Sequence, residues 1–196
     1  MTKTIYILLT ILISATSIYA QDKIGNKLYA YGDLENSVNN KTLVFYGVDD
    51  PKGENKIIKL FEKKGVNAVS WNKLFIPGYK YSDTDMNNTI NEKNIETIIL
   101  IKLNSKSTYT QSNSNTSYNS WTDSFNTSGS SGSVIGNVGL IFEIYNIKDG
   151  FEKPVAVING NANNSWGVAG SQRGVTLKVV DRVLKAMQKK NAFKGK

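Results

Sequence analysis

The sequence contains neither cysteine nor histidine among its 196 residues. Without cysteine there is no disulfide framework, no thiol nucleophile and no bacterial lipobox for attachment of a lipid. Without histidine, Ser-His-Asp and Cys-His constellations and histidine-ligated zinc are excluded, together with the commonest general acid-base group. We therefore expect a protein that is not an enzyme and that carries no cofactor.

Charge is nearly missing from the first twenty residues, MTKTIYILLTILISATSIYA, where Lys3 is the only charged side chain. An apolar run from Ile5 to Ile13 is followed by small and polar residues that end at Ala20. This order is typical of a secretory signal peptide. The alternative, a membrane anchor, needs about 20 mostly apolar residues, and this run is shorter. We expect a signal peptide over residues 1–20 and an exported mature protein, periplasmic or secreted.

The rest of the chain is long enough for one ordinary domain. Loss of Lys3 lowers the formal net charge from +8 to +7, an excess that favours acidic partners such as lipopolysaccharide, teichoic acids or nucleic acid. The lysines are scattered, however, mostly where the solvent side of a helix is expected, which favours a role in solubility and no specific nucleic acid. We expect a single αβ domain over residues 21–191 and a frayed tail over residues 192–196.

The stretch from residue 42 to residue 70 has the pattern of a β-α-β unit. Residues 42–48 form a continuous apolar run typical of a buried strand. Apolar residues at helical spacing over 54–64 predict a helix, Gly65 stands where a C-cap glycine belongs, and 66–70 predict a second strand. This order implies a parallel strand pair with a right-handed crossover.

Three more strands are predicted, at 96–103, 139–146 and 154–158, the last two joined by the hairpin turn Lys148-Asp149-Gly150. A short helix over 84–93 would take Asp83 as its N-cap. Residues 21–41 are polar and weakly patterned, with Leu28, Tyr29 and Tyr31 as expected docking points.

The C-terminal helix, from Ser171 to Lys190, has one apolar stripe: Val175, Val179, Val180, Val183, Leu184 and Met187. The sequence therefore predicts an α/β fold, with α+β as the alternative. Its single domain would hold a mixed, mostly five-stranded sheet with a βαβ start, a β-hairpin and a packed C-terminal amphipathic helix.

Residues 104–133 form an insertion made almost entirely of Ser, Thr, Asn and Gly. Such a composition favours a flexible segment between two core strands. The alternative is an extended hairpin arm that continues both strands, because Thr and Tyr suit a solvated strand. The aromatic residues spaced along it would then contact a partner chain or a glycan: Tyr109, Tyr118, Trp121 and Phe125. Function is expected first in this insertion.

Two smaller constellations are candidate sites. Asp49 and Asp50 follow the first predicted strand and Glu54 opens the next helix, where three carboxylates would hold Mg²⁺ or Ca²⁺. The alternative is a turn in which an Asp caps the helix.

The second constellation precedes the C-terminal helix. There Gly170, Ser171 and Arg173 would hold an anion at the helix N-terminus, or else form a flexible connection and a cap. The aromatic residues Trp71, Tyr79, Tyr81 and Trp166 would form a glycan-stacking surface or belong to the core and its rim.

The order of elements is similar to that of small bacterial cell-envelope domains, those like the TolB N-terminal domain and the CsgG and LpoB periplasmic domains. The likeness lies in the strand-helix-Gly-strand unit (42–70), the strand pair around Lys148-Asp149-Gly150, and the closing helix. The resemblance implies a binding or assembly module of the cell envelope. The lipid-anchoring cysteine common in that group is missing here.

Three functions follow as hypotheses. The first is an exported, non-catalytic protein that binds or assembles with another envelope component through the insertion. The second is a glycan- or polyanion-binding surface protein that uses the same aromatic residues and the positive charge. The third is a divalent-metal-dependent hydrolase built on Asp49, Asp50 and Glu54.

Overall fold

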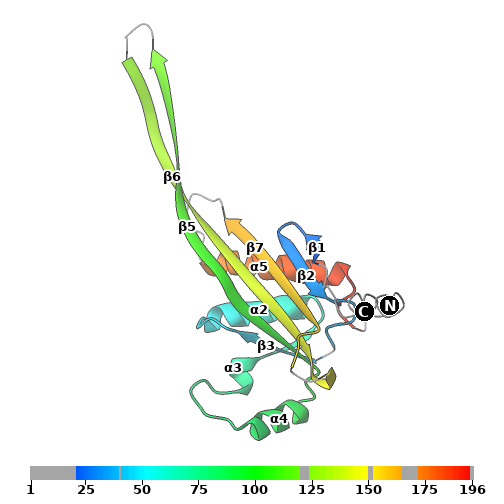
Figure 1. Cartoon of the computed structure of the whole chain (residues 1–196). Helices are drawn as coiled ribbons and strands as arrows, with labels where there is room; N and C mark the ends of the chain where they lie inside the picture. Colours follow the sequence, from blue (N-terminus) through cyan, green and yellow to red (C-terminus); the bar gives the residue numbers. More distant parts are fainter. Residues whose placement is uncertain (1–20, 40, 120–123, 150–151, 165–171, 195–196) are drawn as a thin grey trace, which may run out of the picture.

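The computed structural model describes residues 21–39, 41–119, 124–149, 152–164 and 172–194, and one mixed sheet organises them (Figure 1). The elements in chain order are β1 (Asp22–Gly25), β2 (Leu28–Gly32), β3 (Lys41–Tyr46), α2 (Pro51–Lys63), β4 (Asn67–Ser70), α3 (Trp71–Leu74), α4 (Asp83–Glu92), β5 (Thr97–Asn119), β6 (Ser124–Asn146), η1 (Ile147–Asp149), β7 (Ala156–Asn164) and α5 (Gln172–Lys189).

The sheet has seven strands in the order β1-β2-β7-β6-β5-β3-β4. Strand β3 pairs in parallel with β4, as the βαβ pattern predicts. It also pairs in parallel with β5, and the remaining pairs are antiparallel. The expected count of five strands is wrong because β1 and β2 form an N-terminal hairpin. Its two-residue turn, Asn26–Lys27, places Lys27 at a positive φ of 57° without the glycine that usually marks such a turn.

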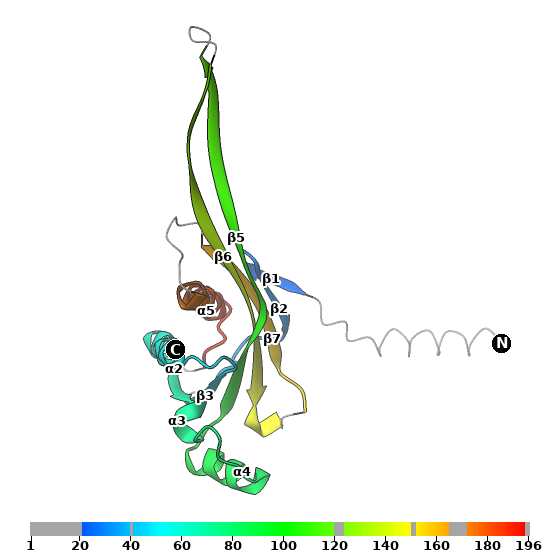
Figure 2. The ribbon, with the colours of Figure 1, turned by 90° about the vertical axis from the view of Figure 1, so that its left-hand side faces the viewer.

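Helices α2 and α5 cover one face of the sheet and enclose the main core (Figure 2). The apolar stripe predicted for α5 is confirmed, since all six of its residues are buried. They meet alternate residues of the sheet such as Ile99, Ile101, Phe142 and Ile158. The period of two along each strand therefore turns one set of side chains toward the helices and the other set away.

Helix α2 begins at Pro51, three residues before the predicted start. Asp50 is its N-cap and accepts a hydrogen bond from the Gly53 N–H at 3.0 Å. Proline at the first helical position loses no intrahelical hydrogen bond, so the segment Asp50-Pro51 favours the earlier start. The predicted C-cap glycine is confirmed, because Gly65 has a φ of +77° and its N–H bonds the Glu62 carbonyl.

Among the described residues, α3, α4 and their connection cover the opposite face of the sheet near β3, β4 and β5. A second apolar cluster lies there, built on Leu43, Phe75, Ile90, Ile95 and Ile98. Helix α4 matches the predicted range, but its N-cap is not Asp83. Ser82 caps it through a capping box, in which the Ser82 hydroxyl accepts from the Asp85 N–H while the Asp85 carboxylate accepts from the Ser82 N–H.

The expected frayed tail is instead docked over its described part. Ala192 is fully buried and Phe193 is 9% exposed. Phe193 bridges in parallel to Val38, and the Lys194 N–H donates to the Val38 carbonyl at 2.9 Å. The basic residues of the tail suggested a frayed end, but Ala192 and Phe193 anchor it. Burial of an aromatic side chain outweighs the fraying of a polar terminus.

We predict that Leu184→Ala lowers the free energy of unfolding by about 2–5 kcal/mol, because Leu184 is fully buried against the sheet and its truncation leaves a cavity. The matched control is Leu103→Ala, since Leu103 is 39% exposed and its truncation should cost less than about 1 kcal/mol. Urea unfolding at neutral pH measures both variants. Equal losses would contradict the placement of α5 on the sheet.

Candidate functional site

The insertion is a two-stranded arm. Strands β5 and β6 each run for 23 residues and pair from Thr97↔Asn146 to Asn119↔Ser124. The first half of β5 and the second half of β6 are inner strands of the sheet, and the other halves project beyond it (Figures 1 and 2). Of the two predictions for residues 104–133, the hairpin arm is the one that matches the structure.

Two of the candidate contact residues are cross-strand partners in the arm. Tyr118 is paired with Phe125 near the tip, and Tyr109 is paired with Ile135 closer to the sheet. Trp121 lies outside the described residues. The pairing therefore places aromatic positions at both ends of the arm, which the sequence spacing alone did not fix.

The arm exposes backbone edges. In the described part of the chain, β3 pairs with β5 only as far as Ile101, and β7 pairs with β6 only as far as Gly136. Beyond these points each strand has one partner, so residues 106–119 and 124–135 present N–H and C=O groups along both outer edges. Residues 106–119 extend for about 45 Å at a rise of about 3.3 Å per residue.

The arm has almost no charge. Lys106 and Asp123 are the only ionisable carboxyl or amino side chains over residues 106–135. A polyanion would find no cluster of cations there. Strand edges with small polar side chains instead suit recognition through backbone hydrogen bonds.

The carboxylates of Asp49, Asp50 and Glu54 do not converge. Asp49 is exposed, Asp50 faces Arg173, and Glu54 is 3% exposed beneath the end of β4. Among the described residues, no group of three or more acidic side chains is placed to hold a metal ion. The arrangement matches the alternative prediction, a turn in which an Asp caps the helix.

Glu54 fastens α2 to the next elements. The Ser70 hydroxyl donates to Glu54 Oε1, and Asn72 Nδ2 donates to Glu54 Oε2 at 2.5 Å. Ser70 also caps α3 by accepting from the Lys73 N–H. A buried carboxylate with two hydrogen-bond donors is stabilised in place, so Glu54 fixes where β4 ends and α3 begins.

Arg173, a candidate for anion binding, is engaged by Asp50. Its Nε donates to Asp50 Oδ2 at 2.7 Å and its Nη2 donates to Oδ1 at 2.6 Å. This two-point contact joins the start of α5 to the N-cap of α2 and uses the guanidinium fork internally. Gly170 and Ser171, the other residues of the predicted anion site, lie outside the described residues.

The ion pair with Arg173 also shifts the pKa of the Asp50 carboxyl. Hydrogen bonds from Arg173 hold the pKa of the Asp50 carboxyl below its usual value, against the opposing effect of desolvation, and the Gly53 N–H adds to the lowering. Nearby, burial raises the pKa of Tyr46, with Asp50 acting in the same direction. The segment that follows β3 therefore holds an ion pair with α5, and it is not an open ligand site.

A groove lies between α4 and the face of the sheet opposite α2 and α5. It has a volume of about 480 Å³, with Trp71, Met86 and Leu100 among its apolar walls and Asp83 and Asn87 at its rim. The Tyr145 hydroxyl also lines it and donates to Glu143 at 3.0 Å. Burial, followed by this carboxylate, raises the pKa of Tyr145.

The aromatic residues near this groove form a connected series. Ring centroids lie 5.6 Å apart for Phe45–Trp71, 4.6 Å for Trp71–Phe75, 5.2 Å for Phe75–Tyr81 and 4.7 Å for Tyr79–Tyr81. The sequence singled out Trp71, Tyr79 and Tyr81, while Trp166 lies outside the described residues. Met86 and Tyr145 were missed because they reach the groove from α4 and β6, which only tertiary contacts bring together.

Comparison with known proteins shows a fold and no family. No protein-family model matches the sequence, and no curated protein matches it. Among solved structures, a point variant of PelC from Paraburkholderia phytofirmans, solved as a dodecamer, is similar in fold with a TM-score of 0.50 and 13% identity, over 83% of this chain and 98% of that chain. A second crystal form of that dodecamer gives 0.49 and 12%, over 82% and 98%.

A minor lipoprotein from Acinetobacter baumannii gives a TM-score of 0.35 and 9% identity, over 78% of this chain and 92% of that chain. The resemblance to TolB, CsgG and LpoB domains stays a prediction. No helix in the part of the chain that the structure describes is long and apolar enough to cross a membrane.

We predict that Asp50→Asn destabilises the protein at pH 7, because Asn keeps the helix cap and loses the ion pair with Arg173. The folded-state pKa of Asp50 is lowered, so its contribution is present above the unfolded-state value of about 3.9 and is lost as the pH falls through the folded value. The gap between wild type and variant should therefore narrow as the pH falls below the unfolded-state value.

The matched control is Asp49→Asn, which removes the same charge from an exposed neighbour and should leave stability nearly unchanged. Thermal unfolding followed by circular dichroism across this pH range measures all three proteins. If wild type and Asp50→Asn have parallel pH profiles, the ion pair does not stabilise the fold.

Proposed function

We propose that this chain is an exported, non-catalytic protein of the cell envelope that binds or assembles with another envelope component through the β5–β6 arm. The observation that carries the proposal is the arm itself, which continues two inner strands of the sheet and has no neighbouring strand on either side among the described residues. Export is supported by the signal-peptide pattern of residues 1–20.

The physical reason lies in the arm's open edges. A two-stranded ribbon is marginally stable in water, and a third strand adds backbone hydrogen bonds on one side. An extended segment of a partner protein would pair with β5 or β6 in this way, with alternate side chains setting its specificity. The aromatic positions Tyr109, Tyr118, Trp121 and Phe125 would supply the large contact areas that dominate protein interfaces.

A second copy of this chain is one such component. PelC, which shares the fold, was solved as a dodecamer, so a chain with this fold is compatible with assembly into a multi-copy particle. The two edges of the arm belong to different strands, so pairing of β5 in one copy with β6 in the next would be heterologous, which generates rings or filaments.

A glycan is the second candidate partner. The groove of about 480 Å³ beside Trp71 and Tyr145, with Asp83 and Asn87 at its rim, offers aromatic walls and short polar side chains together. Binding to the groove would be lost in Trp71→Ala and unaffected by removal of the arm, so the two candidates are separable.

We predict that removal of the arm abolishes partner binding and leaves the domain folded. Residues 109–135 are replaced by Asn-Gly, which joins the cross-strand partners Thr108 and Gly136 through a two-residue turn and keeps every pair between β6 and β7. Pull-down from envelope extract with the mature chain and with this variant measures binding, and thermal unfolding checks the fold.

A second variant keeps the arm at full length and replaces Tyr109, Tyr118, Trp121 and Phe125 with Ser. Because truncation of interface aromatics commonly costs about 2 kcal/mol or more, we expect binding at least about tenfold weaker. Capture of the same partner by the variant without the arm, in equal amount, would refute the proposed function.

A further inference from the structure

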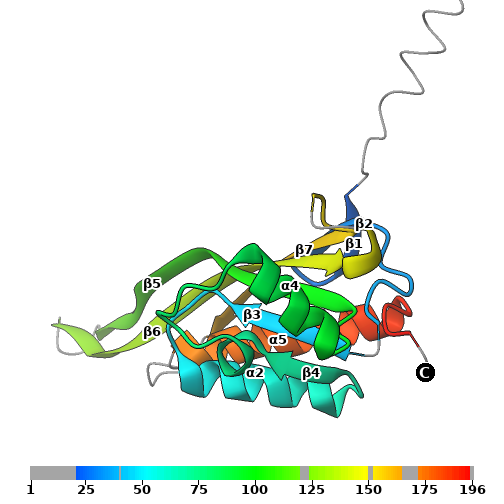
Figure 3. The same ribbon diagram turned by 90° about the horizontal axis from the view of Figure 1, so that it is seen from below.

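Helices α2 and α5 lie side by side on one face of the sheet (Figure 3). Residues of both helices line a groove on their outward surface. The groove has a volume of about 400 Å³. Its floor is made by Leu60 of α2 and Leu177 of α5, both half-buried. Four lysines surround it: Lys56, Lys59, Lys63 and Lys178.

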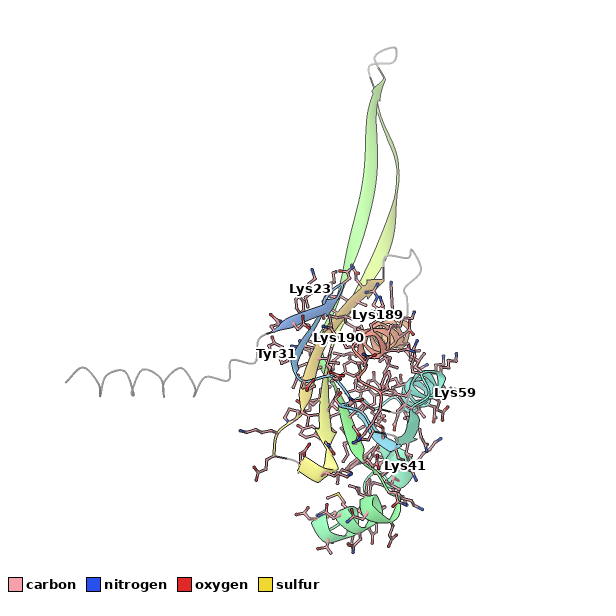
Figure 4. The ribbon with its side chains drawn as sticks, turned by 90° about the vertical axis from the view of Figure 1, so that its right-hand side faces the viewer. Lys23, Tyr31, Lys41, Lys59, Lys189 and Lys190 are labelled. Atoms are coloured by element: carbon pink, nitrogen blue, oxygen red, sulfur yellow. The ribbon has the colours of Figure 1, made fainter. Side chains whose placement is uncertain are left out.

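The spacing along α2 creates this arrangement. Lys56, Lys59 and Lys63 follow one another at intervals of three and four residues, so they share one stripe of the helix. The buried residues of α2 occupy the other side, where Ile57 and Phe61 face the core. Figure 4 shows Lys59 on the side of the sheet opposite Tyr31.

Among the described residues, the lysines of α2 have no carboxylate within ion-pair distance, although Lys56 interacts electrostatically with Asp50. Lys178 donates to the Asn163 carbonyl at 3.2 Å. Helices α2 and α5 together hold nine basic and three acidic residues, a net charge of +6. Helix α4, on the other side of the sheet, holds three acidic residues and no basic one.

A cluster of like charges is unfavourable unless an anion lies against it. The apolar floor adds a second requirement, because contact with hydrocarbon would remove the apolar surface of Leu60 and Leu177 from water. Lysine side chains can lay their methylene stems on an apolar surface while their ammonium groups reach outward to phosphates. Anionic amphiphiles meet both conditions, whereas a nucleic acid would leave the leucines without a partner.

We propose that the α2–α5 groove is a docking surface for a membrane that contains anionic lipids, with the four lysines contacting headgroup phosphates and the two leucines contacting the acyl boundary. Positive charge at such a surface is attracted to anionic lipid within a Debye length. Docking through α2 and α5 would leave the other face of the sheet and the arm free. The inference therefore stands apart from the proposed function.

Co-sedimentation with vesicles tests the proposal. The mature chain, residues 21–196, is mixed with vesicles of phosphatidylcholine alone or with one quarter phosphatidylglycerol. We expect binding only to the phosphatidylglycerol vesicles, and at least tenfold weaker binding for the triple variant Lys56→Gln/Lys59→Gln/Lys63→Gln. Gln has a helix propensity similar to that of Lys, so α2 should stay intact.

The matched control is Lys80→Gln/Lys93→Gln/Lys148→Gln, which removes the same charge from exposed residues outside α2 and α5. We expect its vesicle binding to stay within twofold of wild type. An equal loss in both triple variants would mean that net charge alone drives binding, and would overturn the proposal.

A further variant, Leu60→Gln/Leu177→Gln, separates a lipid from a soluble polyanion. We expect it to bind anionic vesicles at least threefold more weakly than wild type while binding a DNA oligonucleotide unchanged, with thermal unfolding as the check on its fold. Vesicle binding equal to that of wild type, together with tight binding of the oligonucleotide by both proteins, would overturn the proposal in favour of a nucleic acid surface.

Discussion

Strands β5 and β6 pair in one antiparallel ladder from Thr97↔Asn146 to Asn119↔Ser124. This ladder forms both the centre of the sheet and the arm. Near the helices the ladder is the centre of the sheet, where Ile99, Ile101, Phe142 and Ile144 are fully buried. Beyond Gly136 the same strands continue without β7. A two-stranded ribbon is marginal alone, so the buried half of the ladder sets the register that the arm inherits.

The ladder is not uniform. Its register shifts between Leu103 and Ser105, just beyond the last pair of β5 with β3, and again between Asn113 and Asn115 within the arm. Such bulges bend strands and increase their twist, so the first one redirects the arm as it leaves the core. At the same end of the sheet, the ion pair between Asp50 and Arg173 joins α2 to α5, and the buried Glu54 joins α2 to Ser70 and Asn72. The domain thus presents a rigid base, a projecting ribbon and a basic helical face.

The elements that the sequence predicted well are those with a strong period. The strand over 42–48, the α2 stripe and the α5 stripe have apolar residues whose spacing decides their structure. The arm was predicted only as one of two alternatives, because its polar composition fits both a coil and a solvated strand. Its pairing comes from core strands on which it depends, not from its own side chains.

The features that could not be predicted from the sequence depend on tertiary contacts. Asp50 and Arg173 are separated by 123 residues, and nothing in their local sequence joins them. The N-terminal hairpin was missed because its edge strand is short and has no long apolar run, and because neither turn residue, Asn26 or Lys27, is a glycine. The tail was misjudged from its charge, because Phe193 docks at Val38, far away in the sequence. The groove beside the lysines of α2 could not be predicted because it is lined by residues of both α2 and α5.

Hydrogen exchange of the arm amides shows whether the arm is where a partner binds. In the free mature chain, residues 106–119 and 124–135 should exchange much faster than residues 98–101 and 140–144, because the edges of the ribbon are open to solvent. With the captured partner added, the account predicts that the arm peptides gain protection. Protection confined to other parts of the chain, with the arm unchanged, would contradict it.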